Sequence, residues 1–325
     1  MRLVIHIHDL PMWSLPPAQV ERIRRALPDV DVVDVREQEH AAQALASADV
    51  ALATRMTADS LATASALRWV HSTAVGVGAL PLSALAARGI PVTNTRGVHA
   101  EMIAEHALAM LLGLRRQFPA AASHRADRTW GQREMSTVVM PRLAATTVLV
   151  LGLGAIGERF ATFASAMGMR VIGIRRDVTQ SQVPGVQRAK PLSALRDLLP
   201  IADAVVLALP HTPETHHVLG AAELALMKPS AMVINIARGT LIDEAALADA
   251  LIAGRLGGVG LDVFTREPLD ADSPLWTTPR TILTPHTSAF DGDYWTPAVD
   301  LFLANWQHFV NGEPLQNRVD PTRGY

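Results

Sequence analysis

The chain has 325 residues and is 49% hydrophobic, so it can bury the cores of two domains rather than one. Its formal net charge of −2 gives no reason to expect nucleic acid as a partner, and the lack of cysteine excludes a disulfide framework, a thiolate zinc site and a cysteine nucleophile. The sequence shows neither a signal-peptide pattern nor an apolar run of the roughly 18 residues that a membrane helix needs. We therefore expect a soluble cytoplasmic protein without a membrane partner.

Short apolar runs alternate with helical patterns along most of the chain. The first predicted strands are 3–9, 30–35, 50–54, 68–73 and 91–95, and the helices between them are 17–27, 40–47, 57–66 and 81–88. A long helical pattern follows at 100–118, and we interpret the polar segment 119–145 as an irregular connector. The alternation begins again with predicted strands at 146–152, 169–174, 203–209, 231–237, 258–264 and 281–286, and a last helical pattern occupies 297–311. This alternation is typical of parallel sheets covered by helices, so the sequence predicts an α/β fold of two Rossmann-like or flavodoxin-like domains with an active-site cleft between them.

A glycine loop opens the second series of strands and helices. Gly152, Gly154 and Gly157 follow an apolar strand pattern and begin an alanine-rich helical pattern, with Ala155 and Ile156 among them. The first glycine permits a tight turn, the second lets the backbone approach a pyrophosphate, and the third lets helix and strand pack closely. Unpaired N–H groups at the helix N-terminus suit phosphates. In this strand–loop–helix context the pattern predicts a dinucleotide-binding site.

Two arginines, Arg175 and Arg176, stand where the next predicted strand ends. In an NAD-binding unit a carboxylate normally occupies this place and binds the ribose 2′-hydroxyl, but here the nearest carboxylate, Asp177, comes later. A guanidinium fork suits a 2′-phosphate. The sequence therefore predicts that NADP(H) is preferred, with NAD(H) as the alternative cofactor. Two solvated surface arginines would be the structural alternative.

Three residues able to support hydride transfer lie just beyond predicted strands: Arg238, Glu267 and His286. Because ligands of open α/β sheets bind at the carboxyl ends of strands, the three side chains could converge. An arginine grips a carboxylate with two parallel hydrogen bonds, a histidine delivers a proton near neutral pH, and a glutamate can orient and support the histidine. Each residue alone could instead have a purely structural role: Arg238 could cap a turn, Glu267 could form a surface ion pair, and His286 could be a buried histidine with its hydrogen bonds satisfied.

The order of motifs along the chain resembles the D-isomer-specific 2-hydroxyacid dehydrogenase family. The motifs are GLGAIG, LPHTPETHHVLG, NIARGTLIDEAALADAL, GLDVFTREPLDADSPLW and TPHTSA, with HSTAVGVGAL and VTNTRGVHAEMIAEHALAMLL upstream and NWQHFVNGEPLQNRVD downstream. The resemblance covers nearly the whole chain, although the first 65 or so residues match only in pattern. It implies that Arg238 binds the substrate, that His286 is the general acid/base and that Glu267 supports this histidine. It also implies that Val75 and Gly76 hold the substrate carboxylate.

The resemblance extends to further positions. Arg55 is a loose match to a substrate-facing arginine of some relatives, and a surface arginine is an equal alternative. On the cofactor side, Pro210 and Thr212 match the loop beside the adenosine, and Ala237 and Asp262 match positions near the nicotinamide amide.

By the same resemblance the chain divides into a discontinuous substrate-binding (catalytic) domain, 1–98 plus 290–325, and an inserted dinucleotide-binding Rossmann domain, 99–289. The helix at 100–118 would help to form a homodimer. The Arg175-Arg176 pair departs from the commonest family pattern and resembles the NADP-using glyoxylate/hydroxypyruvate reductases. His211 is a second departure, since a hydrophobic residue is usual at its position.

We therefore expect an oxidoreductase that uses NADP(H) to reduce a small 2-oxo acid, glyoxylate or hydroxypyruvate first among them, to a D-2-hydroxy acid. One alternative is a phosphite- or formate-oxidising relative, although formate-type relatives pair the histidine with glutamine where this chain has Glu267. A dinucleotide-sensing corepressor would keep the same triad and is the alternative from another class. His211, His216 and His217 could suggest a metal site, but they lie in a stretch that matches a family loop and the chain lacks cysteine, so we expect no metal.

Overall fold

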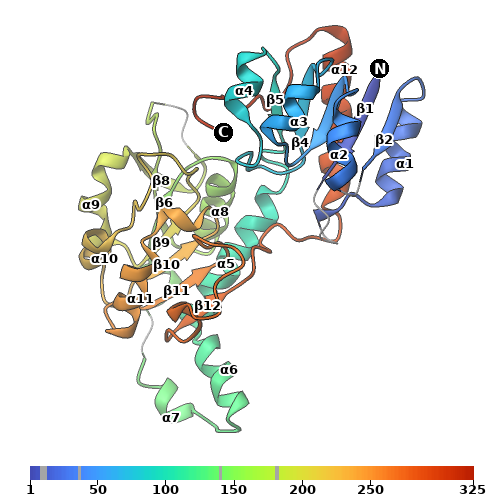
Figure 1. The fold of residues 1–325 in the computed structure, drawn as a ribbon. Helices are drawn as coiled ribbons and strands as arrows, with labels where there is room; N and C mark the ends of the chain where they lie inside the picture. Colours follow the sequence, from blue (N-terminus) through green and yellow to red (C-terminus); the bar gives the residue numbers. More distant parts are fainter. Residues whose placement is uncertain (8–12, 36–37, 139–140, 180–182) are drawn as a thin grey trace. The chain divides into compact units, whose positions relative to one another are not determined.

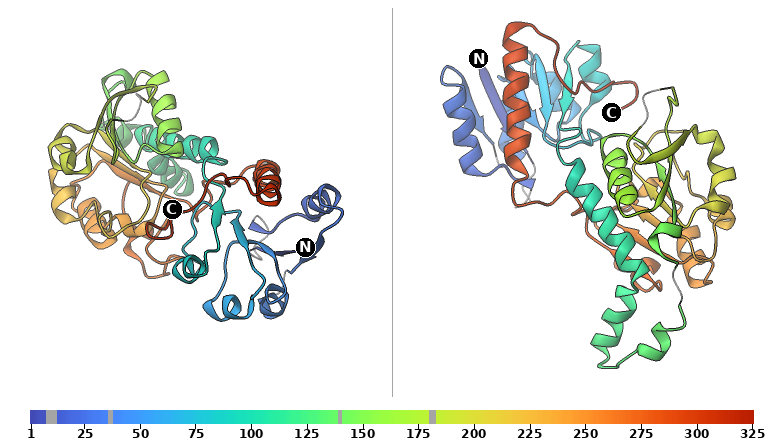
Figure 2. Two further views of the ribbon diagram at one scale, coloured as in Figure 1. Left: turned by 90° about the horizontal axis from the view of Figure 1, so that it is seen from above. Right: turned by 180° about the vertical axis from the view of Figure 1, so that it is seen from behind.

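The computed structural model describes residues 1–7, 13–35, 38–138, 141–179 and 183–325. The chain forms two compact units, one made of Met1–His99 with Phe290–Tyr325 and the other of Ala100–Ala289. Each unit contains one parallel sheet with helices on both faces, as the alternation of apolar runs and helical patterns predicted (Figure 2). The α/β fold class is thereby confirmed.

The smaller sheet belongs to the unit that contains both chain termini. Its strands are β1 (Arg2–His6), β2 (Asp31–Asp34), β3 (Val50–Ala53), β4 (Trp69–Ser72) and β5 (Val92–Asn94), paired in the order β2-β1-β3-β4-β5 (Figure 1). Residues 8–9 of the first predicted strand lie outside the described residues. The helices are α1 (Pro17–Ala26), α2 (Gln38–Leu45), α3 (Ala58–Thr63), α4 (Leu82–Ala87) and α12 (Trp295–Asn311). Helices α1 and α12 pack together, as do α2, α3 and α4 in a row.

The core of this unit explains why its strands read as continuous apolar runs. All four residues of β3 and of β4 are buried, because both faces of a parallel sheet are covered. On one face, Trp69 stacks on Phe302 of α12 with ring centroids 5.5 Å apart. The strands run parallel, so their carboxyl ends share one edge of the sheet, and the loop that follows β4 begins there.

The larger sheet lies within Ala100–Ala289. Its strands are β6 (Thr147–Leu151), β7 (Arg170–Ile174), β8 (Val186–Lys190), β9 (Ala204–Leu207), β10 (Met232–Asn235), β11 (Gly258–Leu261) and β12 (Thr281–Leu283), in the parallel order β12-β11-β10-β9-β6-β7-β8. The chain proceeds from β6 towards one edge and from β9 towards the other. The boundary between β6 and β9 is therefore the topological switch point, where ligands of open α/β sheets bind.

Two helical layers cover this sheet. One contains α5 (Ala100–Arg115) and α8 (Ala155–Ala166), which pack against each other, and the other contains α9 (Leu195–Leu198), α10 (Ala221–Leu226) and α11 (Glu244–Ile252). Short 3₁₀ turns occupy Leu143–Ala145, Leu192–Ala194, Leu199–Ile201, Gly239–Leu241 and Pro274–Trp276. No helix among the described residues is long and apolar enough to cross a membrane.

The segment 119–145 is not the irregular connector that the sequence predicted. It contains the end of α6 (Phe118–Ala126) and all of α7 (Gln132–Met135), which project from the larger unit (Figure 1). The run FPAAASHRA is rich in alanine and has proline in its first turn, both of which favour a helix. Neither helix has a buried residue within its described length, so the apolar periodicity that reveals a packed helix is missing.

Candidate active site

His286 and Glu267 form a hydrogen-bonded pair at the edge of the larger sheet. His286 follows β12 and Glu267 lies in the loop after β11. The Nδ1 atom of His286 lies 2.7 Å from Oε2 of Glu267, and the other carboxylate oxygen accepts a hydrogen bond from the Phe264 N–H at 3.0 Å. Burial alone would raise the pKa of Glu267, but these hydrogen bonds and the charges of His286 and Arg238 hold it below its ordinary value. The carboxylate is therefore ionised near neutral pH and accepts, so Nδ1 of His286 carries the proton.

Arg238 reaches the same sheet edge from β10. The side chain of Asn235 shapes the segment between strand and arginine, because it accepts from the Ala237 N–H at 3.1 Å and donates to the Arg238 carbonyl at 2.8 Å. Burial lowers the pKa of Arg238 and the Glu267 carboxylate opposes this shift, while the side chain keeps an exposed surface. The guanidinium remains charged at neutral pH, because the ordinary pKa of arginine lies far above neutrality.

A glycine lets the Arg238 segment pack against the Glu267 loop. A Cβ at Gly239 would lie 1.9 Å from the Phe264 carbonyl carbon, which no side chain could tolerate. Strands β10, β11 and β12 are neighbours and parallel, so Arg238, Glu267 and His286 come from three adjacent strand ends. The structure thus brings together the three residues that the sequence singled out.

The glycine loop joins β6 to α8 at the switch point. Gly152 has φ +100°, and a Cβ there would lie 2.6 Å from the Ala208 carbonyl oxygen. A Cβ at Gly157 would lie 1.9 Å from the Gly152 carbonyl oxygen, so loop and helix touch there. Gly154 is the N-cap of α8, and a Cβ built on it would meet no described atom within 4 Å. Ala155 and Ile156 form the first helical turn. The uncrowded backbone at Gly154 and the N–H groups of this turn suit a pyrophosphate.

Basic residues end two neighbouring strands of the larger sheet. Arg175 and Arg176 follow β7, and Lys190 is the last residue of β8. Lys190 pairs in register with Ile174, and its carbonyl accepts from the Arg175 N–H at 3.0 Å. Asp177 instead accepts from the N–H and hydroxyl of Thr179, at 2.9 and 2.6 Å. Lys190 was not predicted from the sequence, because β8 is a mostly polar edge strand without an apolar run.

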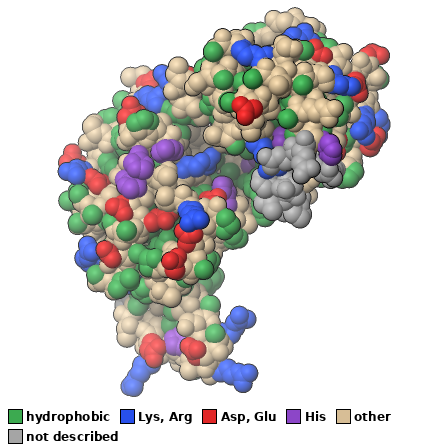
Figure 3. Space-filling view, viewed as in Figure 1, with side chains coloured by type: hydrophobic (Ala, Val, Ile, Leu, Met, Phe, Trp, Pro, Cys, Tyr) green, Lys and Arg blue, Asp and Glu red, His purple; other side chains and the backbone are tan. Residues whose placement is uncertain are grey.

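The loop after β9 lies on the other side of the switch point. It contains Pro210 and Thr212, and the hydroxyl of Thr215 holds it by accepting from the Thr212 N–H and donating to the Pro210 carbonyl, both at 2.8 Å. The histidines at 211, 216 and 217 are exposed, and the rings of the last two stack with centroids 4.0 Å apart. Figure 3 shows histidine side chains gathered on the surface of this unit.

In the smaller unit, the loop that contains Val75 and Gly76 follows β4. The Asn94 side chain donates to the Val75 carbonyl at 2.8 Å. Just before it, the Thr73 carbonyl accepts from the hydroxyls of Thr95 and Tyr294, at 2.9 and 3.1 Å. The loop is therefore held from two sides, and the contribution of Tyr294 could not be foreseen from sequence, since 221 residues separate it from Thr73.

Arg55 follows the neighbouring strand, β3. Its Nε atom is buried and has no hydrogen-bond partner among the described residues. Burial lowers the pKa of His6, the Val35 carbonyl opposes this, and the charge of Arg55 lowers it further. Arg55 therefore lies near the buried end of β1 rather than on an open surface, which argues against the simple surface reading.

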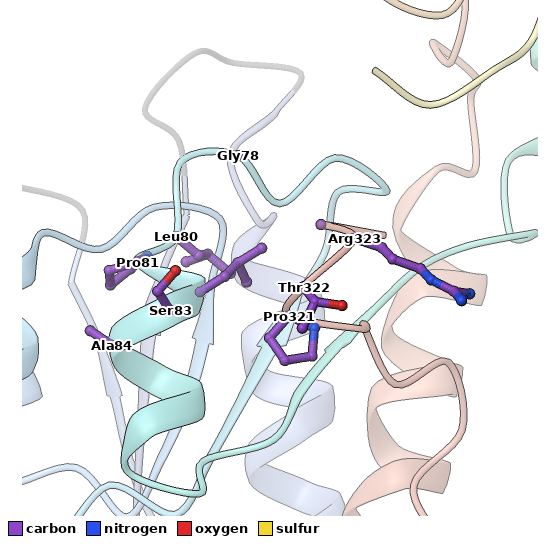
Figure 4. A pocket seen from close by; sticks show the side chains of 10 residues that line it. Gly78, Leu80, Pro81, Ser83, Ala84, Pro321, Thr322 and Arg323 are labelled. Atoms are coloured by element: carbon purple, nitrogen blue, oxygen red, sulfur yellow. The ribbon is translucent and has the colours of Figure 1, made fainter. Parts of the chain in front are cut away.

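A shallow pocket elsewhere in the smaller unit contains none of the predicted site residues (Figure 4). It measures about 530 Å³ and is lined by Gly78, Leu80, Pro81, Leu82, Ser83, Ala84, Pro321, Thr322, Arg323 and Gly324. Arg323 pairs with Asp320 at 3.3 Å, so the basic group is already matched by a carboxylate.

Comparisons with known proteins agree on one family. The family model "D-isomer specific 2-hydroxyacid dehydrogenase, NAD binding domain" matches residues 108–288. The D-3-phosphoglycerate dehydrogenase of Mycobacterium bovis is 38% identical over 264 residues, which make up 80% of this chain and 49% of that protein, so the chain spans about half the length of this relative. The glyoxylate/hydroxypyruvate reductase B of Pectobacterium carotovorum is 33% identical over 289 residues, 87% of this chain and 88% of that protein.

A solved structure of similar fold contains a cofactor. It is the D-isomer specific 2-hydroxyacid dehydrogenase of Xanthobacter autotrophicus Py2 in complex with NADPH and MES. The TM-score is 0.84 with 30% sequence identity, and the match covers 100% of this chain and 99% of that one.

Proposed function

Because the chain belongs to the D-isomer specific 2-hydroxyacid dehydrogenase family, we propose that it is an NADPH-dependent reductase of a small 2-oxo acid, with glyoxylate or hydroxypyruvate as substrate and the D-2-hydroxy acid as product. The single observation that supports the chemistry best is the 2.7 Å hydrogen bond between His286 and Glu267, with Arg238 on the adjacent strand end. The larger unit would bind the dinucleotide and the smaller unit would contribute substrate contacts.

Each of the three residues has a distinct task in this proposal. Arg238 binds the substrate carboxylate through the two parallel hydrogen bonds that a guanidinium can make. His286 delivers a proton to the carbonyl oxygen as the hydride arrives at the carbonyl carbon, and Glu267 stabilises the protonated ring through its Nδ1–H. Bound NADPH would supply the hydride. The backbone N–H groups of Val75 and Gly76, on a loop that is already hydrogen-bonded, would assist with the carboxylate.

The preference for NADPH rests on charge at the ends of β7 and β8. Arg175 and Arg176 stand after β7, where a ribose-binding carboxylate is usual, and Lys190 ends the neighbouring strand β8. Asp177 is engaged with Thr179. The Xanthobacter neighbour with NADPH supports the same choice. Replacing Lys190 with alanine should lower kcat/KM for NADPH and leave that for NADH nearly unchanged. Arg170→Ala, at the opposite end of β7, is the matched control.

A second substrate class has an observation in its favour. The D-3-phosphoglycerate dehydrogenase of Mycobacterium bovis is 38% identical to this chain, more than the 33% of the Pectobacterium reductase. Oxidation of D-3-phosphoglycerate is therefore the second candidate activity. A panel of 2-oxo acids with and without a phosphate, assayed with NADPH and NADH, separates the two candidates. Activity confined to phosphorylated substrates would replace the first proposal by the second, and inactivity on every acid would point to a binding protein.

We also propose a cytoplasmic homodimer. Helices α6 and α7 project from the larger unit; Phe118, the first residue of α6, is 63% exposed, and Trp130, between the two helices, is 87% exposed. Exposed large apolar side chains on such an extension favour burial against a second copy. Light scattering after size exclusion should give twice the 34.9 kDa of one chain, and Trp130→Ser should weaken the association.

A further inference from the structure

A buried carboxylate holds the turn that contains His286. Asp262 follows β11 and is fully buried. Its Oδ1 accepts from the Thr284 hydroxyl at 2.6 Å and from the Thr287 N–H at 2.8 Å, and its Oδ2 accepts from the Ser288 N–H at 3.0 Å. The Asp262 carbonyl accepts from the His286 N–H at 2.8 Å. All four donors belong to the turn 284–288.

This turn has a backbone conformation that needs support. His286 has φ +55°, in the left-handed region where a side chain is unfavourable. Such conformations persist when the surrounding structure fixes them, and they gather at functional sites. Asp262 accepts hydrogen bonds from Thr284, before His286, and from Thr287 and Ser288, after it. These bonds fix the backbone on both sides of His286 and therefore the direction in which its ring points.

The network continues from Thr284 to a histidine on α5. The Thr284 hydroxyl has a single proton, which it donates to Asp262, so its oxygen must accept from Nε2 of His106 at 3.0 Å. The Nε2 atom of His106 therefore carries a proton. It also lies 3.7 Å from Oδ1 of Asp262, and the His106 side chain is 24% exposed. One helix, one strand end and the active-site turn are thereby joined by a directed chain of hydrogen bonds.

We propose that His106, Thr284 and Asp262 are positioning residues that hold the strained turn so that Nδ1 of His286 faces Glu267. The catalytic part of this proposal rests on the proposed reductase function. In this proposal Asp262 holds the turn, because its buried carboxylate accepts several hydrogen bonds from it. This role is additional to any contact with the nicotinamide amide. None of the three residues needs to touch the substrate for the effect.

Thr284→Val tests the proposal, because it removes the hydroxyl and keeps the shape. We expect kcat to fall about ten- to hundredfold, as for a lost buried hydrogen bond to a charged group, with the dissociation constant for NADPH near the wild-type value. Thr284→Ser restores the hydroxyl and should recover most of kcat. Thr281→Val on β12, whose hydroxyl bonds to Thr278 and Pro279, is the matched control and should leave kcat unchanged.

His106 offers a second pair of variants at a partly exposed site. His106→Gln keeps an N–H donor and should retain more activity than His106→Leu, which keeps none. Long-range proton–nitrogen NMR spectra should show His106 with its proton on Nε2 in the wild type. The opposite tautomer, or equal kcat for the two variants at the wild-type level, would overturn the role of His106.

Hydrogen exchange separates this proposal from the reductase function. Amide exchange in the peptide 284–288 should be faster in Thr284→Val than in the wild type and in Thr281→Val, whether or not a substrate is known. If the wild type reduces no 2-oxo acid, the proposed function fails, but the exchange experiment still tests the network. Unchanged exchange in Thr284→Val would overturn the network. A variant with faster exchange but wild-type kcat on an active enzyme would overturn the positioning role.

Discussion

The Nδ1 atom of His286 lies 2.7 Å from Oε2 of Glu267, although 19 residues separate the two in sequence. If this ring delivers the proton, His286→Ala should lower kcat by about 10²–10⁴, the usual loss when a general acid is removed. Steady-state kinetics at saturating NADPH measure this effect. His216→Ala, at an exposed histidine of the same unit, is the control. A normal kcat in His286→Ala would remove this residue from the chemistry.

The Glu267 carboxylate should make folding stability depend on pH in the acid range. Its pKa in the folded chain lies below the ordinary 4.5, so ionisation favours the folded state above that value, and the contribution disappears as pH falls through the folded pKa. Melting temperatures of wild type and Glu267→Gln should therefore differ at pH 7 and converge as pH falls below 4.5. Glu214→Gln, at an exposed carboxylate, gives the baseline. A difference that grows towards acid pH would contradict the assigned direction.

Replacing two glycines of the cofactor loop with alanine should affect different properties, stability for Gly157 and cofactor affinity for Gly154. Gly157→Ala forces a Cβ onto the Gly152 carbonyl, so it should lower the free energy of unfolding by about 1–3 kcal/mol, as overpacking does. Gly154→Ala meets no described atom within 4 Å and φ is −94°, so stability should stay near the wild type. Its affinity for NADPH should nevertheless fall, because the methyl group would stand where the pyrophosphate is proposed. Unchanged affinity in a stable Gly154→Ala would place the phosphates elsewhere.

Arg238→Lys tests the grip on the substrate carboxylate. An ammonium keeps the charge but cannot make two parallel hydrogen bonds, so kcat/KM for the 2-oxo acid should fall about tenfold or more. Arg255→Lys, at an exposed arginine of the same unit, controls for the exchange of side chains. Equal kinetics for Arg238→Lys and wild type would mean that the carboxylate is held by other groups.

Buried strands were the most predictable part of the fold. Residues 148–151 form an uninterrupted apolar run that predicts a strand, and all five side chains of β6 are buried, as they are in the covered strands of a parallel sheet. Edge strand β8 was missed for the opposite reason, since its side chains, Arg188 among them, are largely accessible and polar. Helix α6 was missed because it covers no core, so its sequence contains no apolar stripe.

Three residues of the candidate site could be predicted from their places just beyond predicted strands. Arg238, Glu267 and His286 follow three strands, and the order of those strands in the sheet is what brings them together. The task of Asp262 could not be predicted, because it depends on backbone N–H groups and on a helix that lies far away in sequence. Lys190 required knowledge of which strand pairs with β7.

The proposed cofactor preference is tested by the ratio of kcat/KM for NADPH to that for NADH, measured with glyoxylate or hydroxypyruvate as the 2-oxo acid. The charges at the ends of β7 and β8 predict a ratio of about ten or more, the contribution of at least one charge-assisted hydrogen bond to the 2′-phosphate. A ratio of one or below would contradict the proposed preference for NADPH, and no reduction of either acid would contradict the proposed reductase activity.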